Sequence, residues 1–402
     1  MSWEKVKLGE LYEVHNGLSK GRRFFGKGYP FLSFSTVFNN YFIPEILSDL
    51  VMSTEQEQTN YSIQRGDVFV TRTSETSDEL GMSCVALRDY PRATYNGFTK
   101  RMRPITDRVL PEYIGYYLRM PRFREEFKAF STMTTRASLK NEDLLSLKVE
   151  LPTLETQRRI ASILSAYDDL IENNRKQIKL LEEAAQRLYK EWFVDLRFPG
   201  YETTAIVDGV PEGWKIKKIS EVASINKRSI SKNYVCSYMD YVDISTVSVG
   251  KIGKLTRYSV HDLPGRARRV AIDGDIIWGM VRPNLRSYAL VLNPSDTSVF
   301  STGFAVLSAE NVPFTFLYCH VTQDDFVGYL VNCTNGAAYP AVKPVHFGQA
   351  KILVPDSNIL NEFNLFTEPL YRKIEMLNKQ ISYATEVRDR LLPKLMSGKI
   401  TV

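Results

Sequence analysis

The sequence has little of the chemistry that holds metal ions or disulfide bridges. Its 402 residues include only four cysteines and four histidines. A structural zinc site needs about four converging ligands, and the chain contains no CxxC pair. Cys319 and His320 are adjacent, but neighbours on one strand or helix point in different directions. We therefore expect no metal site and interpret the cysteines as reduced and mostly buried. They are Cys84, Cys236, Cys319 and Cys333.

Long apolar runs are also missing. The chain opens with MSWEKVKLGE, which carries charges from the start, and no apolar stretch typical of a signal peptide follows. The run Ile276-Ile277-Trp278 is far too short to cross a bilayer. We therefore expect a cytoplasmic protein with no membrane partner.

Motifs of the common catalytic sites are absent. The sequence has no GxGxxG after a strand, no GxxxxGK[ST], no HExxH and no GxSxG. The stretch Arg282-Pro283-Asn284-Leu285 is a poor match to the Asn-Pro-Pro-aromatic tetrad of amino-methyltransferases. Asp168 and Asp169 are sequence neighbours, and we interpret them as a solvated helix face rather than a nuclease metal site. We expect a non-catalytic binding subunit that holds no cofactor or metal of its own.

The composition is that of a folded protein, because 44% of the residues are hydrophobic and 24% are charged. A disordered chain would have fewer apolar residues and more net charge. A chain of 402 residues is too long for one ordinary core, which predicts two domains with connecting elements. The net charge of +6 is only weak support for a polyanionic partner.

The most informative feature that is present is a long internal repeat. The tripeptide Lys-Gln-Ile at 176–178 returns at 379–381, displaced by 203 residues. Other correspondences have offsets between 203 and 211, as small insertions in variable loops would produce. They comprise Trp3 with Trp214, Glu10 with Glu221, Gly66-Asp67 with Gly274-Asp275, Gly97-Phe98 with Gly303-Phe304, and Lys140 with Lys343. We interpret the Gly-Asp pairs as turns that begin apolar strands, and the Gly-Phe pairs as parts of strand-like runs.

Two long helices are predicted, one after each half of the repeat. Pro152 stops a strand, and Thr153 is a plausible N-cap for the first helix. Apolar residues then recur in steps of four and three, which is a heptad pattern. The stripe of the first helix is Ile160, Leu164, Tyr167, Ile171, Asn174, Ile178, Leu181, Ala185, Leu188 and Trp192. The stripe of the second is Phe363, Thr367, Leu370, Ile374, Leu377, Ile381, Ala384, Arg388 and Leu391.

Such a stripe needs a partner, and the chain supplies one, so the pattern predicts that the two helices pair with each other. Each helix of about 40 residues would be about 60 Å long. Asn174 is the polar intruder in the first stripe, and Thr367 and Arg388 interrupt the second. We expect the pair to be less tight near Arg388. The predicted interface residues for helix pairing or subunit docking are Ile171, Asn174, Ile178, Leu181, Ile374, Leu377 and Ile381.

Basic and hydroxyl-rich loops in both halves favour contact with DNA. The segment Pro264–Arg269 places three arginines on a predicted Pro/Gly turn, and Arg282–Tyr288 alternates cations, an amide and an aromatic residue. Arginine can bind guanine bidentately, asparagine can bind adenine, and either can contact phosphate. The candidate DNA-binding residues are Arg22, Arg23, Arg72, Thr73, Arg136, Lys140, Arg266, Arg268, Arg269, Arg282, Asn284, Arg286 and Lys343.

These segments resemble the specificity subunits of type I restriction–modification enzymes. The resemblance covers nearly the whole chain and is carried by LPTLETQRRIASILSAYDDLIENNRKQI, EWFVDLRFPG and RDRLLPKLMSGKI. It implies that two target-recognition domains each read one half of a bipartite, interrupted double-stranded DNA site. It also implies that the paired helices dock two copies of an adenine-N6 methyltransferase subunit, with an endonuclease and translocase subunit joining them. S-adenosylmethionine, ATP and magnesium would belong to those partners.

The expected fold class is therefore α+β, with an internal pseudo-twofold repeat. Each target-recognition domain would be a mixed sheet with flanking helices, and two long antiparallel helices forming a coiled coil would separate them. The expected ranges are 1–152 for the first domain, 153–195 for the central helix, 196–354 for the second domain, and 355–402 for the distal helix and tail.

Alternative functions remain open at this point. A coiled-coil scaffold that does not bind DNA would show affinities insensitive to salt, whereas phosphate contacts give a steep salt dependence. A stand-alone nuclease or methylase would be active as the isolated chain. A specificity subunit of a related phage-defence methylation system would act without a nuclease.

Overall fold

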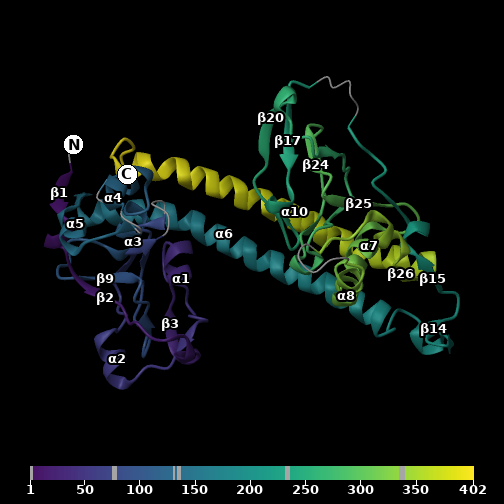
Figure 1. Cartoon of the computed structure of the whole chain (residues 1–402), viewed down its shortest axis with the longest axis horizontal. Coiled ribbons are helices and arrows are strands. Elements are labelled where there is room, and N and C mark those ends of the chain that lie inside the picture. The colour runs from purple at the N-terminus through teal and green to yellow at the C-terminus, as the bar shows by residue number, and fades with distance from the viewer. Residues whose placement is uncertain (1–2, 75–78, 130–131, 134–136, 231–235, 335–339) are drawn as a thin grey trace. The chain divides into compact units, whose positions relative to one another are not determined.

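The chain folds into two compact units whose boundaries lie inside two long helices (Figure 1). Unit 1 comprises Met1–Glu172 with Ile381–Val402, and unit 2 comprises Asn173–Gln380. The helices are α6, Leu154–Tyr189, and α10, Ser357–Met396, so each unit contains part of both. The computed structural model describes residues 3–74, 79–129, 132–133, 137–230, 236–334 and 340–402.

The long helices begin where the sequence predicts. Strand β12, Lys148–Leu151, ends at Pro152, and the Thr153 hydroxyl then accepts a hydrogen bond from the Thr156 amide at 3.3 Å. The Asp356 carboxylate does the same for α10, accepting from the Asn358 amide at 2.9 Å. Both are N-caps that satisfy amides left unpaired at a helix start. After α6 the chain makes one π-helical turn, Lys190–Val194, in which Trp192 is buried.

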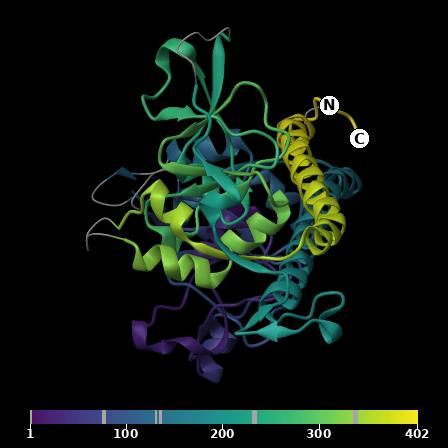
Figure 2. The ribbon, with the colours of Figure 1, turned by 90° about the vertical axis from the view of Figure 1, so that its right-hand side faces the viewer.

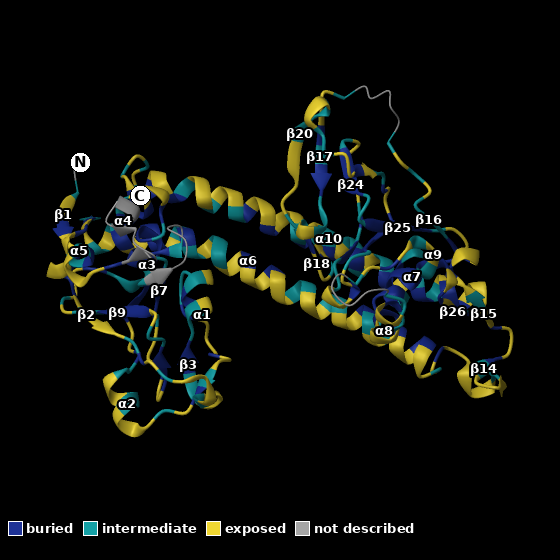
Figure 3. Ribbon diagram, viewed as in Figure 1, coloured by how far each residue is buried: buried dark blue, intermediate teal, exposed yellow. Residues whose placement is uncertain are grey.

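The heptad stripes form the contact between α6 and α10, and every stripe position is buried or half-buried. Figure 3 shows exposed residues along the outer faces of both helices. In unit 1 Asp168 pairs with Arg388, whereas in unit 2 Asn174 pairs with Gln380. The partner's number falls as the α6 number rises, so the helices are antiparallel, as predicted.

The polar residues in the stripes each have an ion-pair or hydrogen-bond partner. Arg388 forms an ion pair with Asp168 at 2.5 Å, and its side chain is only 14% exposed. The interpretation of Asp168 as part of a solvated face is therefore wrong, because its carboxylate also accepts from the Tyr116 hydroxyl, whereas the expectation of a less tight pair near Arg388 stays a prediction. Asn174 is 2% exposed, and its amide donates to the Gln380 side-chain oxygen at 3.1 Å. Thr367 is buried and donates its hydroxyl to the Phe363 carbonyl at 2.8 Å.

Unit 1 is built on an antiparallel sheet of order β2-β9-β5-β7. A smaller sheet of order β4-β3-β8 includes a parallel pair, β3 with β8, and β1 pairs with β12. The strands are β1 (Glu4–Lys7), β2 (Tyr12–Asn16), β3 (Phe25–Leu32), β4 (Leu50–Val51), β5 (Val68–Thr71), β6 (Thr73–Ser74), β7 (Ser83–Val85), β8 (Thr94–Tyr95), β9 (Thr99–Pro104), β10 (Thr132–Met133) and β11 (Ala137–Ser138). The short helices are α1 (Phe34–Asn39), α2 (Glu55–Asn60), α3 (Pro111–Tyr117), α4 (Pro121–Ala129) and α5 (Asn141–Ser146).

Unit 2 repeats this topology with different loops. Its central sheet has the order β16-β25-β22-β23, a parallel pair joins β17 and β24, and β15 pairs with β26. The strands are β13 (Ile206–Val207), β14 (Val210–Pro211), β15 (Lys215–Lys218), β16 (Ala223–Ile225), β17 (Tyr238–Val242), β18 (Val247–Ser248), β19 (Lys251–Ile252), β20 (Thr256–Ser259), β21 (Ala267–Arg269), β22 (Ile276–Gly279), β23 (Tyr288–Leu290), β24 (Ser298–Ser301), β25 (Phe304–Ala309) and β26 (Lys351–Val354). The helices are α7 (Phe314–Val321), α8 (Asp324–Asn332) and α9 (Pro344–Gln349). Figure 2 shows the antiparallel strands β17 and β20 projecting from the rest of this unit.

The repeated Gly-Asp pairs have the same physical cause in both units. Gly66 and Gly274 have φ angles of +90° and +84°, a conformation that favours glycine. The aspartate that follows each glycine folds back on the turn and accepts an amide hydrogen bond at 2.8 Å, from Gln64 for Asp67 and from Ile272 for Asp275. The predicted turns before β5 and β22 are thereby confirmed.

The repeated Gly-Phe pairs differ from the prediction. Gly97 and Phe98 lie in a turn before β9, and Gly303 lies in a turn before β25, so only Phe304 is part of a strand. Phe98 is 57% exposed, whereas Phe304 is fully buried. The shared Gly-Phe letters mark an equivalent turn but not an equivalent side-chain environment.

Each unit has its own apolar core on the side of its sheet that faces α6 and α10. In unit 1, Leu164 of α6 and Leu392 of α10 join a cluster with β5 and α3. In unit 2, Ala185 of α6 and Phe363 of α10 join a cluster with β22 and α7. Among the described residues, no helix is long and apolar enough to cross a membrane.

Candidate nucleic-acid interface

The loop after β22 in unit 2 carries three of the candidate DNA-binding residues. It begins where the Arg282 amide donates to the Pro340 carbonyl at 2.8 Å and ends where the Gly279 amide donates to the Ser287 carbonyl at 2.7 Å. Arg282 and Asn284 are exposed within it. Arg286 is half-buried, because its guanidinium pairs with the Asp324 carboxylate at 2.5 Å. The loop therefore presents one cation and one amide outward and holds the second cation against α8.

The backbone of this loop is fixed in an uncommon shape. Arg282 and Arg286 have φ angles of +49° and +55°, which places both in the left-handed region. Side chains other than glycine rarely adopt that region, and each instance costs about 1–3 kcal/mol. The short turn Pro283–Leu285 lies between them, with Leu285 58% exposed. Such strain at both ends of an exposed loop is a common feature of binding sites.

The second basic segment of unit 2 differs from its prediction. Only Arg266 lies in the turn, because 267–269 form strand β21 beside β24. Arg268 is exposed, whereas Arg269 is half-buried, and its Nε atom has no hydrogen-bond partner among the described residues. The two basic segments meet at one turn, since the Thr302 amide donates to the Arg266 carbonyl and the Met280 amide donates to the Gly303 carbonyl.

Unit 1 places its candidates on an equivalent arrangement. The loop after β5 contains Arg72, and its strand β6, which contains Thr73, pairs with β11. The Leu139 amide donates to the Arg72 carbonyl at 3.0 Å, and Lys140 follows at the start of α5. In unit 2 the Val342 amide donates to the Met280 carbonyl at 2.9 Å, and Lys343 follows at the start of α9.

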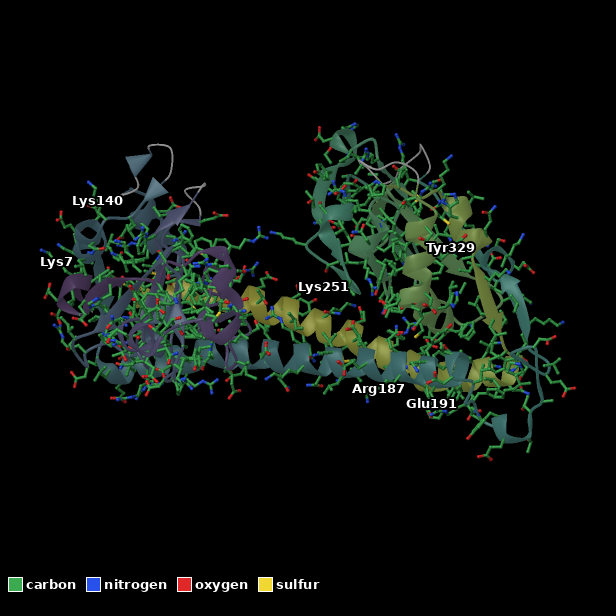
Figure 4. The ribbon with its side chains drawn as sticks, turned by 60° about the horizontal axis from the view of Figure 1, so that its bottom comes forward. Lys7, Lys140, Arg187, Glu191, Lys251 and Tyr329 are labelled. Carbon is green, nitrogen blue, oxygen red and sulfur yellow. The ribbon has the colours of Figure 1, made fainter. Side chains whose placement is uncertain are left out.

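This correspondence brings the two lysines to the same position in each unit. Lys140 and Lys343 are 203 residues apart, both are exposed, and each is the residue before a short helix. Figure 4 shows Lys140 at the surface of unit 1, on the same unit as Lys7. Backbone hydrogen bonds thus join the segment at Arg72 to the residue before Lys140 in unit 1, and the segment 280–282 to residues shortly before Lys343 in unit 2.

Two further candidates of unit 1 lie elsewhere. Arg22 and Arg23 are exposed on a 3₁₀ turn, Arg22–Phe24, and the amide of Met52, the residue after β4, donates to the Phe24 carbonyl. Arg23 lies over the Phe24 ring at 4.9 Å. Arg136 lies outside the described residues.

Lys100 is a cation that the sequence prediction missed. It lies on β9 in the central sheet of unit 1 and is only 6% exposed. Its ammonium group donates to the Asn141 side chain. Burial, and then the charge of Arg72, lower the pKa of Lys100. Its only signal in the sequence is a lysine two residues after the Gly-Phe turn, in the basic strand Thr-Lys-Arg-Met-Arg-Pro.

The predicted interface residues on α6 and α10 all lie on the facing sides of the two helices. Ile171, Asn174, Ile374, Leu377 and Ile381 are buried, and Ile178 and Leu181 are half-buried against the core of unit 2. They are therefore in the helix pair. Residues on the outer faces, such as Leu180 and Tyr383, are about two-thirds exposed.

The comparisons with known proteins bear on this doubled arrangement. The family model described as type I restriction modification DNA specificity domain matches residues 1–183. Residues 1–183 are a type I DNA specificity domain. Its sheet β2-β9-β5-β7 and the loop after β5 recur in unit 2, which the repeat relates to the specificity domain.

Relatives of the whole chain carry the same name. The specificity subunit of the type I restriction enzyme MjaIX from Methanocaldococcus jannaschii is 25% identical over 418 residues, covering 100% of this chain and 94% of the relative. The HindI specificity subunit from Haemophilus influenzae is 22% identical over 483 residues, covering 99% of both. The predicted family is thereby confirmed, and the expected specificity role agrees with these relatives.

A solved structure supports the fold. The S subunit of a type I restriction-modification system from M. genitalium has a TM-score of 0.61 at 15% identity, covering 98% of this chain and 96% of that one. At this identity the likeness supports the fold alone, which is an α+β architecture with two units and long helices. The chain is thus similar over its whole length to type I specificity subunits, and residues 1–183 match the DNA specificity domain.

Proposed function

We propose that the chain reads a bipartite, interrupted DNA site through one surface in each unit. This proposal rests on an arrangement that both units share. In each unit, a loop after a central strand accepts a backbone hydrogen bond from the residue before an exposed lysine. In unit 1 it comprises Arg72 and Lys140, and in unit 2 it comprises Arg282, Asn284 and Lys343. Cations and amides on fixed loops suit DNA because they can contact phosphates and base edges at once.

The two surfaces have the same frame but different side chains, so two unlike half-sites are expected. Asn284 and Arg282 are exposed in unit 2 and have the chemistry of adenine and guanine recognition. Arg286 supports the loop through Asp324 and is expected to contact phosphate rather than a base. The half-sites would lie about one helical turn of DNA apart, roughly 34 Å.

The partners belong to the same proposal. Two copies of an adenine-N6 methyltransferase subunit would dock on the chain, and an endonuclease and translocase subunit would complete the restriction complex. S-adenosylmethionine, ATP and magnesium would be bound by those subunits. The outer faces of α6 and α10 offer exposed apolar side chains for such docking, including Leu180 and Tyr383.

The test uses the equivalent lysines. Lys140→Met and Lys343→Met are each co-expressed with the methyltransferase subunit, and the methylated motif is read by long-read sequencing. Each variant should relax or weaken one half-site and leave the other intact. The loss of one charge-assisted contact corresponds to about tenfold in affinity. Lys7→Met and Lys218→Met are matched controls, because Lys7 and Lys218 are also equivalent and exposed but lie on β1 and β15. A motif unchanged in both test variants, or equally degraded at both half-sites, would contradict the proposal.

A further inference from the structure

Unit 1 contains two neighbouring cations, Arg72 and Lys100, whose printed side-chain partners within the described part of the chain are both neutral. Among the described residues, no carboxylate forms an ion pair with Arg72 or Lys100. The Arg72 guanidinium donates to the Asn16 side-chain oxygen at 3.2 Å, and the Lys100 ammonium donates to the Asn141 side chain. Both partners are neutral amides. Another cation of β9 does have an acidic partner, because Arg103 pairs with the buried carboxylate of Asp67 at 2.7 Å.

This arrangement is costly for the free protein. A buried charge is normally paired, because burial removes its hydration. Lys100 is almost fully buried, and Arg72 is close enough to lower its pKa further. Two neighbouring positive charges with only neutral partners repel each other, which costs free energy in the folded state. An anion bound between or beside them would remove that cost. A site that keeps such a cost in the folded state is prepared for a ligand of opposite charge.

The surrounding contacts show where the anion would lie. The Leu139 amide is bonded to the Arg72 carbonyl, and the Asn141 side chain is bonded to Lys100, so residues 139–141 connect the two cations. Lys140 lies between Leu139 and Asn141 in sequence and is exposed. The acidic residues of α5, Glu142 and Asp143, form no ion pair with these cations. The cluster therefore has one exposed cation, Lys140, and one buried cation, Lys100.

We infer that Arg72, Lys100 and Lys140 form a phosphate subsite of the unit 1 recognition surface. This inference rests on the proposed function and assigns to unit 1 an anchoring contact that unit 2 lacks. In the central sheet of unit 1, Lys100 lies opposite Val70. At the equivalent pair in unit 2, Ala305 lies opposite Trp278, so an alanine takes the place of Lys100. Lysine suits a phosphate because it is a compact point charge, and phosphate contacts fix the register of a protein on a duplex. Lys100 acts as a positioning residue that raises the potential at Arg72 and Lys140.

The deciding experiment separates binding from stability. Lys100→Met keeps the length of the side chain and removes the charge. Binding of the full-length chain to a duplex of arbitrary sequence is measured against salt concentration, together with the melting temperature. We expect about tenfold weaker binding, a salt slope reduced by about 0.9, and a melting temperature that is unchanged or raised. A purely structural role would instead lower the melting temperature.

Arg103→Met is the matched control, because Arg103 lies on the same strand but has a carboxylate partner. Its loss leaves Asp67 buried without that partner, so this variant should melt at a lower temperature. Lys100→Arg should retain duplex binding. If the wild-type chain binds the duplex and Lys100→Met binds it equally well, the phosphate subsite is wrong while the proposed function stands.

Inorganic phosphate tests the subsite independently of DNA. It should raise the melting temperature of the wild-type chain more than that of Lys100→Met, with chloride at equal ionic strength as the reference. If no duplex binding is seen for the wild type, the proposed function fails, and the phosphate comparison alone decides the subsite. Equal stabilisation of both proteins by phosphate would then overturn it.

Discussion

Units 1 and 2 attach the same two helices with different chemistry at equivalent positions. In unit 1 the Tyr116 hydroxyl of α3 donates to the Asp168 carboxylate of α6. The residues 203 positions later are Cys319 of α7 and Tyr371 of α10, and they are also hydrogen-bonded, at 3.1 Å. A phenol–carboxylate contact in one unit corresponds to a thiol–phenol contact in the other. The repeat therefore preserves the location of a polar contact but not its charge.

The charge in unit 1 requires a further partner. Arg388 of α10 neutralises Asp168 and lies over the Tyr41 ring at 5.2 Å. Burial lowers the pKa of Arg388, but the hydrogen bond and charge of Asp168 outweigh it and raise the value above its usual range. The equivalent of Arg388 in unit 2 is Ala185, which is fully buried. The two helices thus contact each other at this position through a packed alanine in unit 2 and through an ion pair in unit 1.

Breaking the Asp168–Arg388 ion pair should cause the largest difference in stability between the two units. Asp168→Ala removes the partner of Arg388 on α6 and leaves it only the neighbouring Asp389 carboxylate, so unit 1 should be destabilised by at most about 3 kcal/mol. Amide hydrogen exchange of residues 154–172 and 381–396 should accelerate, while exchange in 173–189 should change little.

The double variant Asp168→Ala with Arg388→Ala is the control. It removes both charges and introduces at 388 the residue that unit 2 has at 185, so it should recover most of the loss. A double variant no more stable than the single one would show that the charge was not the cause.

Alanine variants at the two equivalent stripe positions of unit 2, Asn174 and Leu377, should differ in how much stability they lose. Both are 2% exposed. Leu377→Ala should cost about 2–3 kcal/mol, because it creates a cavity in the helix pair. Asn174→Ala should cost about 1 kcal/mol, the contribution of one hydrogen bond to Gln380. Urea unfolding followed by circular dichroism measures both. Equal costs would mean that Asn174 does more than fill its position.

A further effect, confined to unit 2, should come from acid. His320 of unit 2 is hydrogen-bonded to the Tyr189 hydroxyl at 3.0 Å and to the Lys351 carbonyl at 3.1 Å. Burial lowers the pKa of His320 to about 4. The unfolded chain then binds more protons, so stability present at pH 7 is lost as the pH falls from about 6.5 toward 4. The loss from this group should be about 1.4 kcal/mol at pH 5.5.

Unit 1 has Tyr117 at the equivalent position, and its hydroxyl accepts from the Glu150 amide at 2.9 Å. Burial raises the pKa of Tyr117 to about 12, so this group does not titrate in acid. His320→Gln should flatten the pH dependence of unit 2 between pH 7 and 5.5 and leave that of unit 1 as it was. Thermal melts over this pH range would measure the change. A full acid dependence in His320→Gln would place its origin elsewhere.

The sequence predicted most of what depends on local pattern. The heptad stripes, the cap at Thr153 and the turns at Gly66 and Gly274 follow from spacing and residue type, and the structure contains them. The repeat itself required only a comparison of the chain with itself. These features are legible because their causes lie within a few residues or within one period.

The errors arose where the cause lies far along the chain. Asp168 looked solvated because its partner, Arg388, is 220 residues away. Lys100 was missed because its burial depends on the packing of residues 139–141 against the loop after β5. Arg269 was placed on a turn because a Pro-Gly pair precedes it, although β24 extends the backbone there into a strand. The candidate site was thus found by composition, and its internal order came from tertiary contacts.

The fixed backbone of the loop at 282–286 has a consequence for how such a chain can change over generations. Its shape is set by two left-handed residues and by main-chain bonds to Pro340 and Ser287, and not by the side chains of Asn284 or Leu285. Substitutions at those two positions would therefore alter the outward chemistry without the need for a compensating change elsewhere. A lineage could acquire a new DNA preference one codon at a time, and each intermediate would still fold.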